Sequence, residues 1–194
     1  KISFDTIYHE HRNYYSKRSL VNVLKKINLK IVKFENLEYM SGSLRVYLIN
    51  QNFTKIDYTK FKKFNLQLFN KFIKKIIIIR KYLKKFVNKY KNKNIVGIGA
   101  ATKGNTLLNY CGFNFDQINC ILEKSKHKIG KFTPSSAIPI VSENKIVEAD
   151  AIIFLPWNIN SFLKKKFLSK FNVDYISLED IVKNYNDKNQ KTKN

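Results

Sequence analysis

The sequence predicts an α/β fold whose C-terminal part is a Rossmann-like parallel sheet. Two observations point to it. Between residues 91 and 185, short apolar runs of strand length alternate with stretches of helix length, which is typical of a parallel sheet with helices on both faces. The first of these runs leads into the glycine-rich segment 97–106, at the point where such folds turn from strand to helix.

The N-terminal residues 1–52 are expected to form the edge of a larger domain. Ile2–Tyr8 is a short strand-like run, and Ser19 is a candidate cap for a helix through about Ile27. Leu29–Leu37 and Ser43–Ile49 flank a turn and predict a β-hairpin. Because a lone hairpin is marginal in water, we expect this unit to belong to a larger sheet whose other strands lie outside the chain.

Residues 53–90 predict a long helical connector, since apolar residues recur at spacings of three and four with lysines on the other face. The third unit, 91–185, contains strand-like runs that begin near Asn94, Ile118, Ala151 and Tyr175. Residues 186–194 are polar and charged, and we expect a disordered tail there.

The charge balance is strongly basic, with 37 Lys+Arg against 14 Asp+Glu and a net charge of +23. Only four of these basic residues are Arg, whereas the chain has 33 Lys, 23 Asn and 24 Ile, three residue types with A- and T-rich codons. Compositional drift therefore explains the charge better than specific nucleic-acid recognition does, because nucleic-acid readers rely on Arg.

No apolar run approaches the roughly 20 residues of a membrane helix. Cys111 and Cys120 lack zinc-site spacing and are expected to be buried thiols in a reducing cytoplasm.

A first candidate site is the run Tyr8-His9-Glu10-His11. Histidine titrates near neutral pH and serves as a general base. His9 and His11 could also begin a metal site, although no third ligand is evident nearby. The alternative without a functional role is that these are polar surface residues that follow a strand.

A second candidate is the glycine-rich segment with Gly97, Gly99 and Gly104, where Lys103 adds a cation. Such loops let backbone N–H groups approach phosphate, and Glu123 lies where a dinucleotide fold places its ribose-binding acid. The third glycine is displaced from the dinucleotide fingerprint. Two interpretations of the segment therefore remain open. It belongs to an NAD-dependent oxidoreductase, or its glycines allow tight packing of the strand against the helix. A third candidate, Leu155-Pro156-Trp157-Asn158, follows a predicted strand, and Trp157 either stacks on a base or covers the core.

Five ordered motifs together resemble the S-adenosylmethionine-dependent sugar C-methyltransferases, which act on nucleotide-linked keto-deoxysugars. The resemblance extends to about residue 180. Its motifs are Phe4-Asp5-Thr6-Ile7-Tyr8-His9-Glu10-His11, Gly42-Ser43-Leu44-Arg45-Val46-Tyr47, Lys103-Gly104-Asn105-Thr106-Leu107-Leu108-Asn109-Tyr110-Cys111-Gly112, Ile138-Pro139-Ile140 and Leu155-Pro156-Trp157-Asn158.

The resemblance implies a cytoplasmic enzyme of which this chain is the C-terminal part. S-adenosylmethionine would be bound mainly by a preceding domain, and zinc only by an N-terminal segment, both outside this chain. We expect no metal site here, and no productive binding of the methyl donor by the chain alone.

The resemblance also implies roles for individual residues. His11 would remove the proton beside the ketone, Tyr8 would hydrogen-bond the developing oxyanion, and Glu10 would orient a neighbour or the sugar. One departure is the run Ser135-Ser136-Ala137, where relatives are expected to carry Gly-Thr-His, so substrate choice here is in question. The nucleotide-sugar side would be lined by Lys103, Gly104, Asn105, Thr106, Asn109, Trp157 and Asn158.

Overall fold

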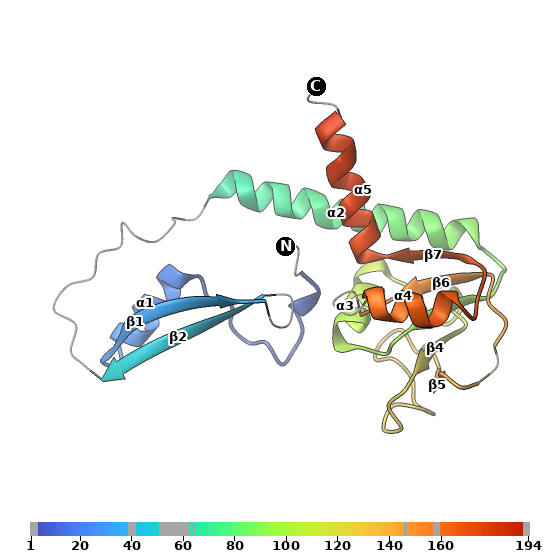
Figure 1. Ribbon diagram of the computed structural model, residues 1–194, viewed down its shortest axis with the longest axis horizontal. Coiled ribbons are helices and arrows are strands. Elements are labelled where there is room, and N and C mark those ends of the chain that lie inside the picture. The colour runs from blue at the N-terminus through green and yellow to red at the C-terminus, as the bar shows by residue number, and fades with distance from the viewer. Residues whose placement is uncertain are drawn as a thin grey trace. The chain divides into compact units, whose positions relative to one another are not determined.

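The computed structural model describes residues 4–38, 42–50, 63, 65–145, 147–156 and 160–191. The chain divides into two compact units (Figure 1). One comprises residues 9–70, and the other joins residues 2–8 to residues 71–194. Each unit is described by itself below.

In its described residues, the unit of residues 9–70 contains a helix and a hairpin, as predicted, and the first residues of a further helix that starts at Leu66. Helix α1 (Lys17–Lys25) starts three residues earlier than expected, because Ser16 rather than Ser19 is its N-cap. The Ser16 hydroxyl accepts the Ser19 N–H at 3.1 Å, and the Ser19 hydroxyl accepts the Ser16 N–H at 2.8 Å, which makes a capping box. Strands β1 (Leu29–Leu37) and β2 (Ser43–Asn50) pair antiparallel, and α1 packs on β1. Several apolar side chains of the hairpin are exposed, Val32 and Ile49 among them.

The second unit is built on a five-stranded parallel sheet, which confirms the predicted α/β class. Its strands are β3 (Ile95–Ile98), β4 (Cys120–Glu123), β5 (Ile140–Ser142), β6 (Ala151–Phe154) and β7 (Asp174–Ser177). Their order in the sheet is β5-β4-β3-β6-β7, and every pair is parallel. From β3 the chain moves to β4 on one side, and it later returns to β6 on the other. The carboxyl ends of β3 and β6 therefore form a topological switch point, where open α/β sheets bind ligands.

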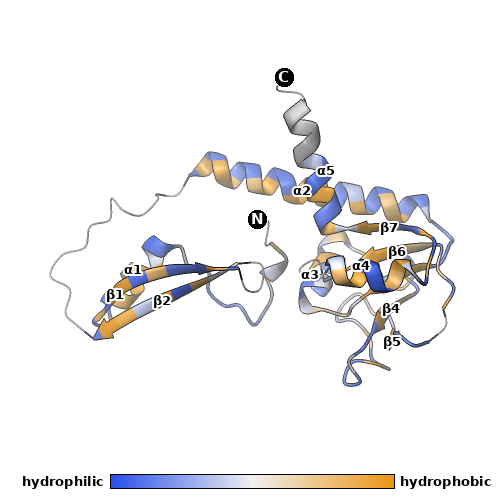
Figure 2. Ribbon diagram, in the orientation of Figure 1, coloured by the Kyte–Doolittle hydropathy of each residue, from blue (hydrophilic) through white to orange (hydrophobic). Residues whose placement is uncertain are grey.

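Helices cover both faces of this sheet, because successive strand residues point to opposite sides. On one face, Ile121 and Ile153 share a core with α2 (Leu66–Lys89), α3 (Thr102–Cys111) and α5 (Leu178–Lys191). On the other face, Ile152 and Phe154 pack with Phe167 of α4 (Asn160–Leu168). Figure 2 shows the strands as mostly hydrophobic and α2 as alternating, which is the pattern expected of a doubly covered sheet.

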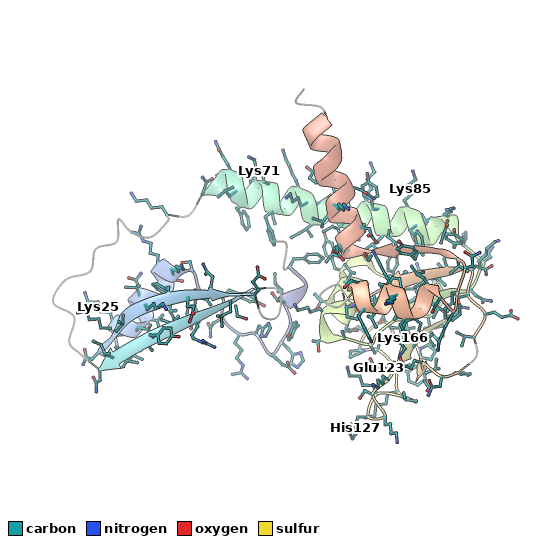
Figure 3. The ribbon with its side chains drawn as sticks, in the orientation of Figure 1. Lys25, Lys71, Lys85, Glu123, His127 and Lys166 are labelled. Atoms are coloured by element: carbon teal, nitrogen blue, oxygen red, sulfur yellow. The ribbon has the colours of Figure 1, made fainter. Side chains whose placement is uncertain are left out.

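Helix α2 confirms the predicted helical stripe within the described residues. It buries Ile76, Ile79, Leu83 and Val87, which recur at spacings of three and four. Asn65 precedes the helix, and its side-chain oxygen accepts the Leu68 N–H at 3.0 Å. Lysines occupy the outer face, as Lys85 illustrates in Figure 3. Residues 53–62 of the predicted connector lie outside the described residues.

Two local predictions need correction. In the described part of the predicted strand Ile2–Tyr8, Phe4–Thr6 forms a 3-10 helix instead, η1, that packs on α3. Phe4 is buried there, so the segment is held by side-chain packing and not by pairing with a strand. The second correction concerns α5, which continues to Lys191 and so enters the segment expected to be a tail. Glu179 and Asp180 lie in its first turn, where acidic side chains favour a helix.

Candidate functional site

The switch point between β3 and β6 is the candidate site, and its shape depends on two close approaches. Gly99 follows β3 with φ of +82°, and a Cβ there would lie 2.5 Å from Cγ of Pro156, which follows β6. Gly104 lies inside α3, where a Cβ would lie 2.6 Å from Cβ of Leu155. Only glycine fits at these two positions. The geometry favours the tight-packing interpretation of both glycines over a phosphate-binding fingerprint.

Glu123, which is labelled in Figure 3, binds backbone groups of the loops that follow β3 and β4. One of its carboxylate oxygens accepts the Ala100 N–H at 2.8 Å. The other accepts the N–H groups of Lys124 and Ser125, each at 2.9 Å. Three backbone N–H groups already occupy this carboxylate and leave it little capacity for the two hydroxyls of a ribose, so the arrangement counts against the dinucleotide-binding alternative. The same geometry does not fit S-adenosylmethionine, whose ribose would need the same acid.

Lys128 ties the loop after β4 to the loop after β3, because its Nζ donates to the Ala100 carbonyl at 2.7 Å. This lysine was not among the predicted site residues. Its loop is rich in lysine, but composition does not say which lysine turns inward. Only its position five residues beyond a strand-ending Glu123 could have suggested the contact.

The N-terminus of α3 opens at the switch point. Its N-cap residue Ala101 has no side chain that could cap the helix, and the first intrahelical bond joins the Asn105 N–H to the Ala101 carbonyl at 3.0 Å. The backbone N–H groups of the first turn are directed out of the helix here, and the helix dipole favours negative charge at this end. Lys103 lies in the same turn. This end of α3 is chemically suited to an anionic ligand.

Polar side chains line α3 beyond that turn. The side-chain oxygen of Asn105 is buried and has no hydrogen-bond partner in the described part of the chain. A buried acceptor without a donor costs about 1–3 kcal/mol, so a donor brought to this atom would be stabilising. Thr106 donates to the Thr102 carbonyl at 3.3 Å, and Asn109 donates to the Pro134 carbonyl at 3.4 Å.

The contact with Pro134 connects α3 to the run Ser135-Ser136-Ala137, where the sequence departs from its expected relatives. Ser135 and Ala137 both have positive φ, +65° and +52°. Such angles are strained for residues other than glycine. The buried hydroxyls of Thr133 and Ser136 lie 2.6 Å apart and hold this loop together. The departure therefore falls directly beside Asn109, one of the predicted substrate-binding residues.

The predicted catalytic run is divided between the two units. Tyr8 is half-buried and belongs with the sheet, two residues after η1, which packs on α3. Glu10 and His11 are exposed residues of the other unit, where the rings of His11 and Tyr14 lie 6.3 Å apart. The structure thus brings Tyr8 into one unit with Lys103, Gly104, Asn105, Thr106 and Asn109. Trp157 and Asn158 lie outside the described residues.

The two cysteines are buried, as predicted, and burial raises both thiol pKa values, that of Cys111 to about 12. Among the described residues, no group of three or more His, Cys, Asp or Glu side chains could hold a metal ion. No helix in the described ranges is both long enough and apolar enough to cross a membrane.

The fold and the site define a doubly wound α/β domain with polar side chains at its switch point. Residues 41–172, more than half of the chain, match the family model of the C-methyltransferase C-terminal domain. The chain therefore belongs to this family. A relative from Streptomyces niveus, the C-methyltransferase NovU, is 27% identical over 172 residues, which cover 80% of this chain and 40% of the relative. The chain thus spans less than half the length of this curated relative, and Tyr8, Glu10 and His11 precede the residues that the family model matches.

Proposed function

We propose that this chain binds a nucleotide-linked keto-sugar and supplies the base for S-adenosylmethionine-dependent C-methylation of that sugar. The observation that carries the proposal is α3. Its N-terminus has no side-chain cap, and it is followed by an Asn105 oxygen that is buried and has no hydrogen-bond partner among the described residues. Family membership supports methyl transfer to carbon as the reaction class.

The proposed substrate has two parts that α3 can recognise separately. The diphosphate carries negative charge, which suits the helix N-terminus and the Lys103 ammonium. The sugar carries hydroxyl groups, which suit Asn105, Thr106 and Asn109. The overall charge of +23 also raises the local concentration of an anionic substrate.

In the proposed reaction, His11 removes the proton from the carbon beside the ketone, and the electron pair of that C–H bond becomes an enolate. The Tyr8 hydroxyl donates a hydrogen bond to the enolate oxygen, and Glu10 orients the base or the sugar. S-adenosylmethionine, when bound, supplies the methyl group that this carbon takes up. Because the glycines and Glu123 of this chain do not fit the donor, we assign its binding to a part of the protein outside this chain.

The base can be tested without the methyl donor. Proton removal alone exchanges deuterium into the carbon beside the ketone when the reaction runs in D2O. We expect the chain to accelerate this wash-in on thymidine- or uridine-diphosphate keto-deoxyhexoses, measured by proton NMR. General base catalysis typically contributes about 100-fold or more, so His11→Ala should lose about that factor.

His9→Ala is the matched control, because His9 is an exposed histidine two residues away in the same run. Circular dichroism should show that both variants fold. A His11→Ala variant that retains the wild-type wash-in rate would refute the assignment of the base. Binding is tested separately by calorimetric titration of the same nucleotide sugars, where Asn105→Leu should weaken the affinity about tenfold, the value of one hydrogen bond.

A further inference from the structure

One buried aromatic side chain, Phe4, holds the segment before the proposed base on the sheet unit. Phe4 begins η1, is 5% exposed, and joins the core shared by α2, α3 and the sheet. Its ring lies 5.4 Å from the ring of Tyr110 in α3, in an edge-on arrangement with an interplanar angle of 63°. Edge-on aromatic pairs of this kind are favourable beyond the area that they bury.

Tyr110 also contacts α2. The guanidinium carbon of Arg80 lies 5.5 Å from the centre of the Tyr110 ring, a cation–π distance. Three elements, η1, α2 and α3, therefore meet at one tyrosine. We call Phe4, Tyr110 and Arg80 the Phe4 anchor.

The connection from the anchor to Tyr8 is short and hydrogen-bonded. The Ile7 N–H donates to the Phe4 carbonyl at 3.0 Å, and the Tyr8 N–H donates to the Thr6 carbonyl at 3.1 Å. These bonds fix the path of the backbone between the buried ring and Tyr8. Glu10 follows Tyr8 after one more residue.

We propose that Phe4 is a positioning residue for proton abstraction. By docking on Tyr110, it fixes Tyr8 to the unit that carries the sugar-binding helix α3, so that the catalytic run starts from a defined place on that unit. The proposal rests on the proposed function, because it takes Tyr8 and His11 as the groups that act on the keto-sugar. A misplacement of about 1 Å can cost about 100-fold in rate, so loss of the anchor should affect catalysis more than substrate affinity.

The test compares Phe4→Ala with Phe113→Ala. Phe113 is also 5% exposed and belongs to the same core, but in the sequence it lies just after α3 and outside the catalytic run. Both variants are assayed in the whole chain at a temperature where circular dichroism shows each to be fully folded. We expect Phe4→Ala to slow deuterium wash-in at saturating sugar by about 100-fold, while its dissociation constant for the nucleotide sugar changes less than about threefold. Phe113→Ala should change neither value, and Phe4→Leu should restore most of the rate.

A second readout does not depend on activity. Amide hydrogen exchange should speed up at least tenfold at Ile7 and Tyr8 in Phe4→Ala, while the core amide of Ile121 keeps its wild-type protection. Equal loss of wash-in in Phe4→Ala and Phe113→Ala, or unchanged wash-in despite faster exchange at Tyr8, would overturn the proposal. Absence of wash-in by the wild-type chain would instead refute the proposed function, and unchanged protection of Ile7 and Tyr8 in Phe4→Ala would refute the anchor independently.

Discussion

Replacement of Gly99 by alanine should destabilise the sheet unit for two separable reasons. The first is backbone strain, since φ at Gly99 is +82°. A left-handed alanine costs about 1–2 kcal/mol, partly offset by about 0.4–1 kcal/mol from the stiffer unfolded chain, which leaves about 1 kcal/mol. The second is overlap with the Pro156 ring, whose Cγ and Cδ would lie 2.5 and 2.9 Å from the new methyl carbon. Overpacking of this kind costs about 1–3 kcal/mol, so the total should be about 2–4 kcal/mol.

Two further variants separate the contributions. Gly130 has the same φ of +82°, but a Cβ there would meet nothing within 4 Å, so Gly130→Ala should cost only the strain of about 1 kcal/mol. Pro156→Ala removes the two ring atoms and leaves a Cβ at 3.9 Å. In that background, Gly99→Ala should therefore also cost about 1 kcal/mol, and the double-mutant cycle should report a coupling of about 1–3 kcal/mol.

The assay is equilibrium urea unfolding followed by far-ultraviolet circular dichroism, with shifts of the midpoint compared at unchanged slope. The reasoning would be refuted if Gly99→Ala cost no more than Gly130→Ala, or if Pro156→Ala failed to relieve it. Either result would mean that the loop after β3 does not depend on contact with the segment after β6.

Three further predictions concern single groups. The pKa of Cys111 is raised to about 12 from an ordinary 9.0, which leaves about 1,000-fold less thiolate at pH 8. Alkylation of Cys111 by iodoacetamide, followed by mass spectrometry, should therefore be slower by about that factor in the native chain than in urea. Ser177→Ala should cost about 1–2 kcal/mol in urea unfolding, because the buried hydroxyl donates to the Asp180 carboxylate at 2.6 Å and accepts the Asp180 N–H at 3.2 Å; a cost below about 0.5 kcal/mol would contradict this. Hydrogen bonding by Lys89 lowers the pKa of Asp174, so its contribution to stability is present above the unfolded pKa of about 3.9 and is lost as the pH falls through the lower folded pKa. Asp174→Asn should therefore flatten the acid limb of the stability curve, only slightly because the pair is exposed, and an unchanged limb would contradict the assignment.

The fold could be predicted from sequence where an element is long or fully buried. β6 buries all four residues, and its uninterrupted apolar run marks a central strand. β5 has only three residues and follows an irregular loop, so no periodicity marks it. α3 starts at Thr102, so Gly104 lies inside a helix and not in the loop that a glycine-rich segment predicts. Its place inside a helix is explained by contact with Leu155, a residue about 50 positions away that no local pattern reveals.

The site could be predicted only as a set of residue types and not as an arrangement. Chain order placed Lys103 and Asn105 after a strand, and the sheet topology indeed puts them at the switch point. The pattern could not show that Glu123 is occupied by three backbone N–H groups, because that depends on how two loops meet. It also could not show that Tyr8 and Glu10 fall in different compact units, since this follows from the burial of Phe4.

The exposed hairpin of the first unit bears on the handling of this protein. In the described residues, β1 and β2 form a two-stranded sheet, so each leaves one row of backbone groups without a neighbouring strand. Such edges are templates for pairing between chains, and exposed Val32 and Ile49 make that pairing more favourable. Lys30 and Lys33 on β1 act as gatekeepers, because charge repulsion keeps two edges apart. Salt screens this repulsion over about 10 Å at 0.1 M, so the chain should be kept at low ionic strength to keep it monodisperse.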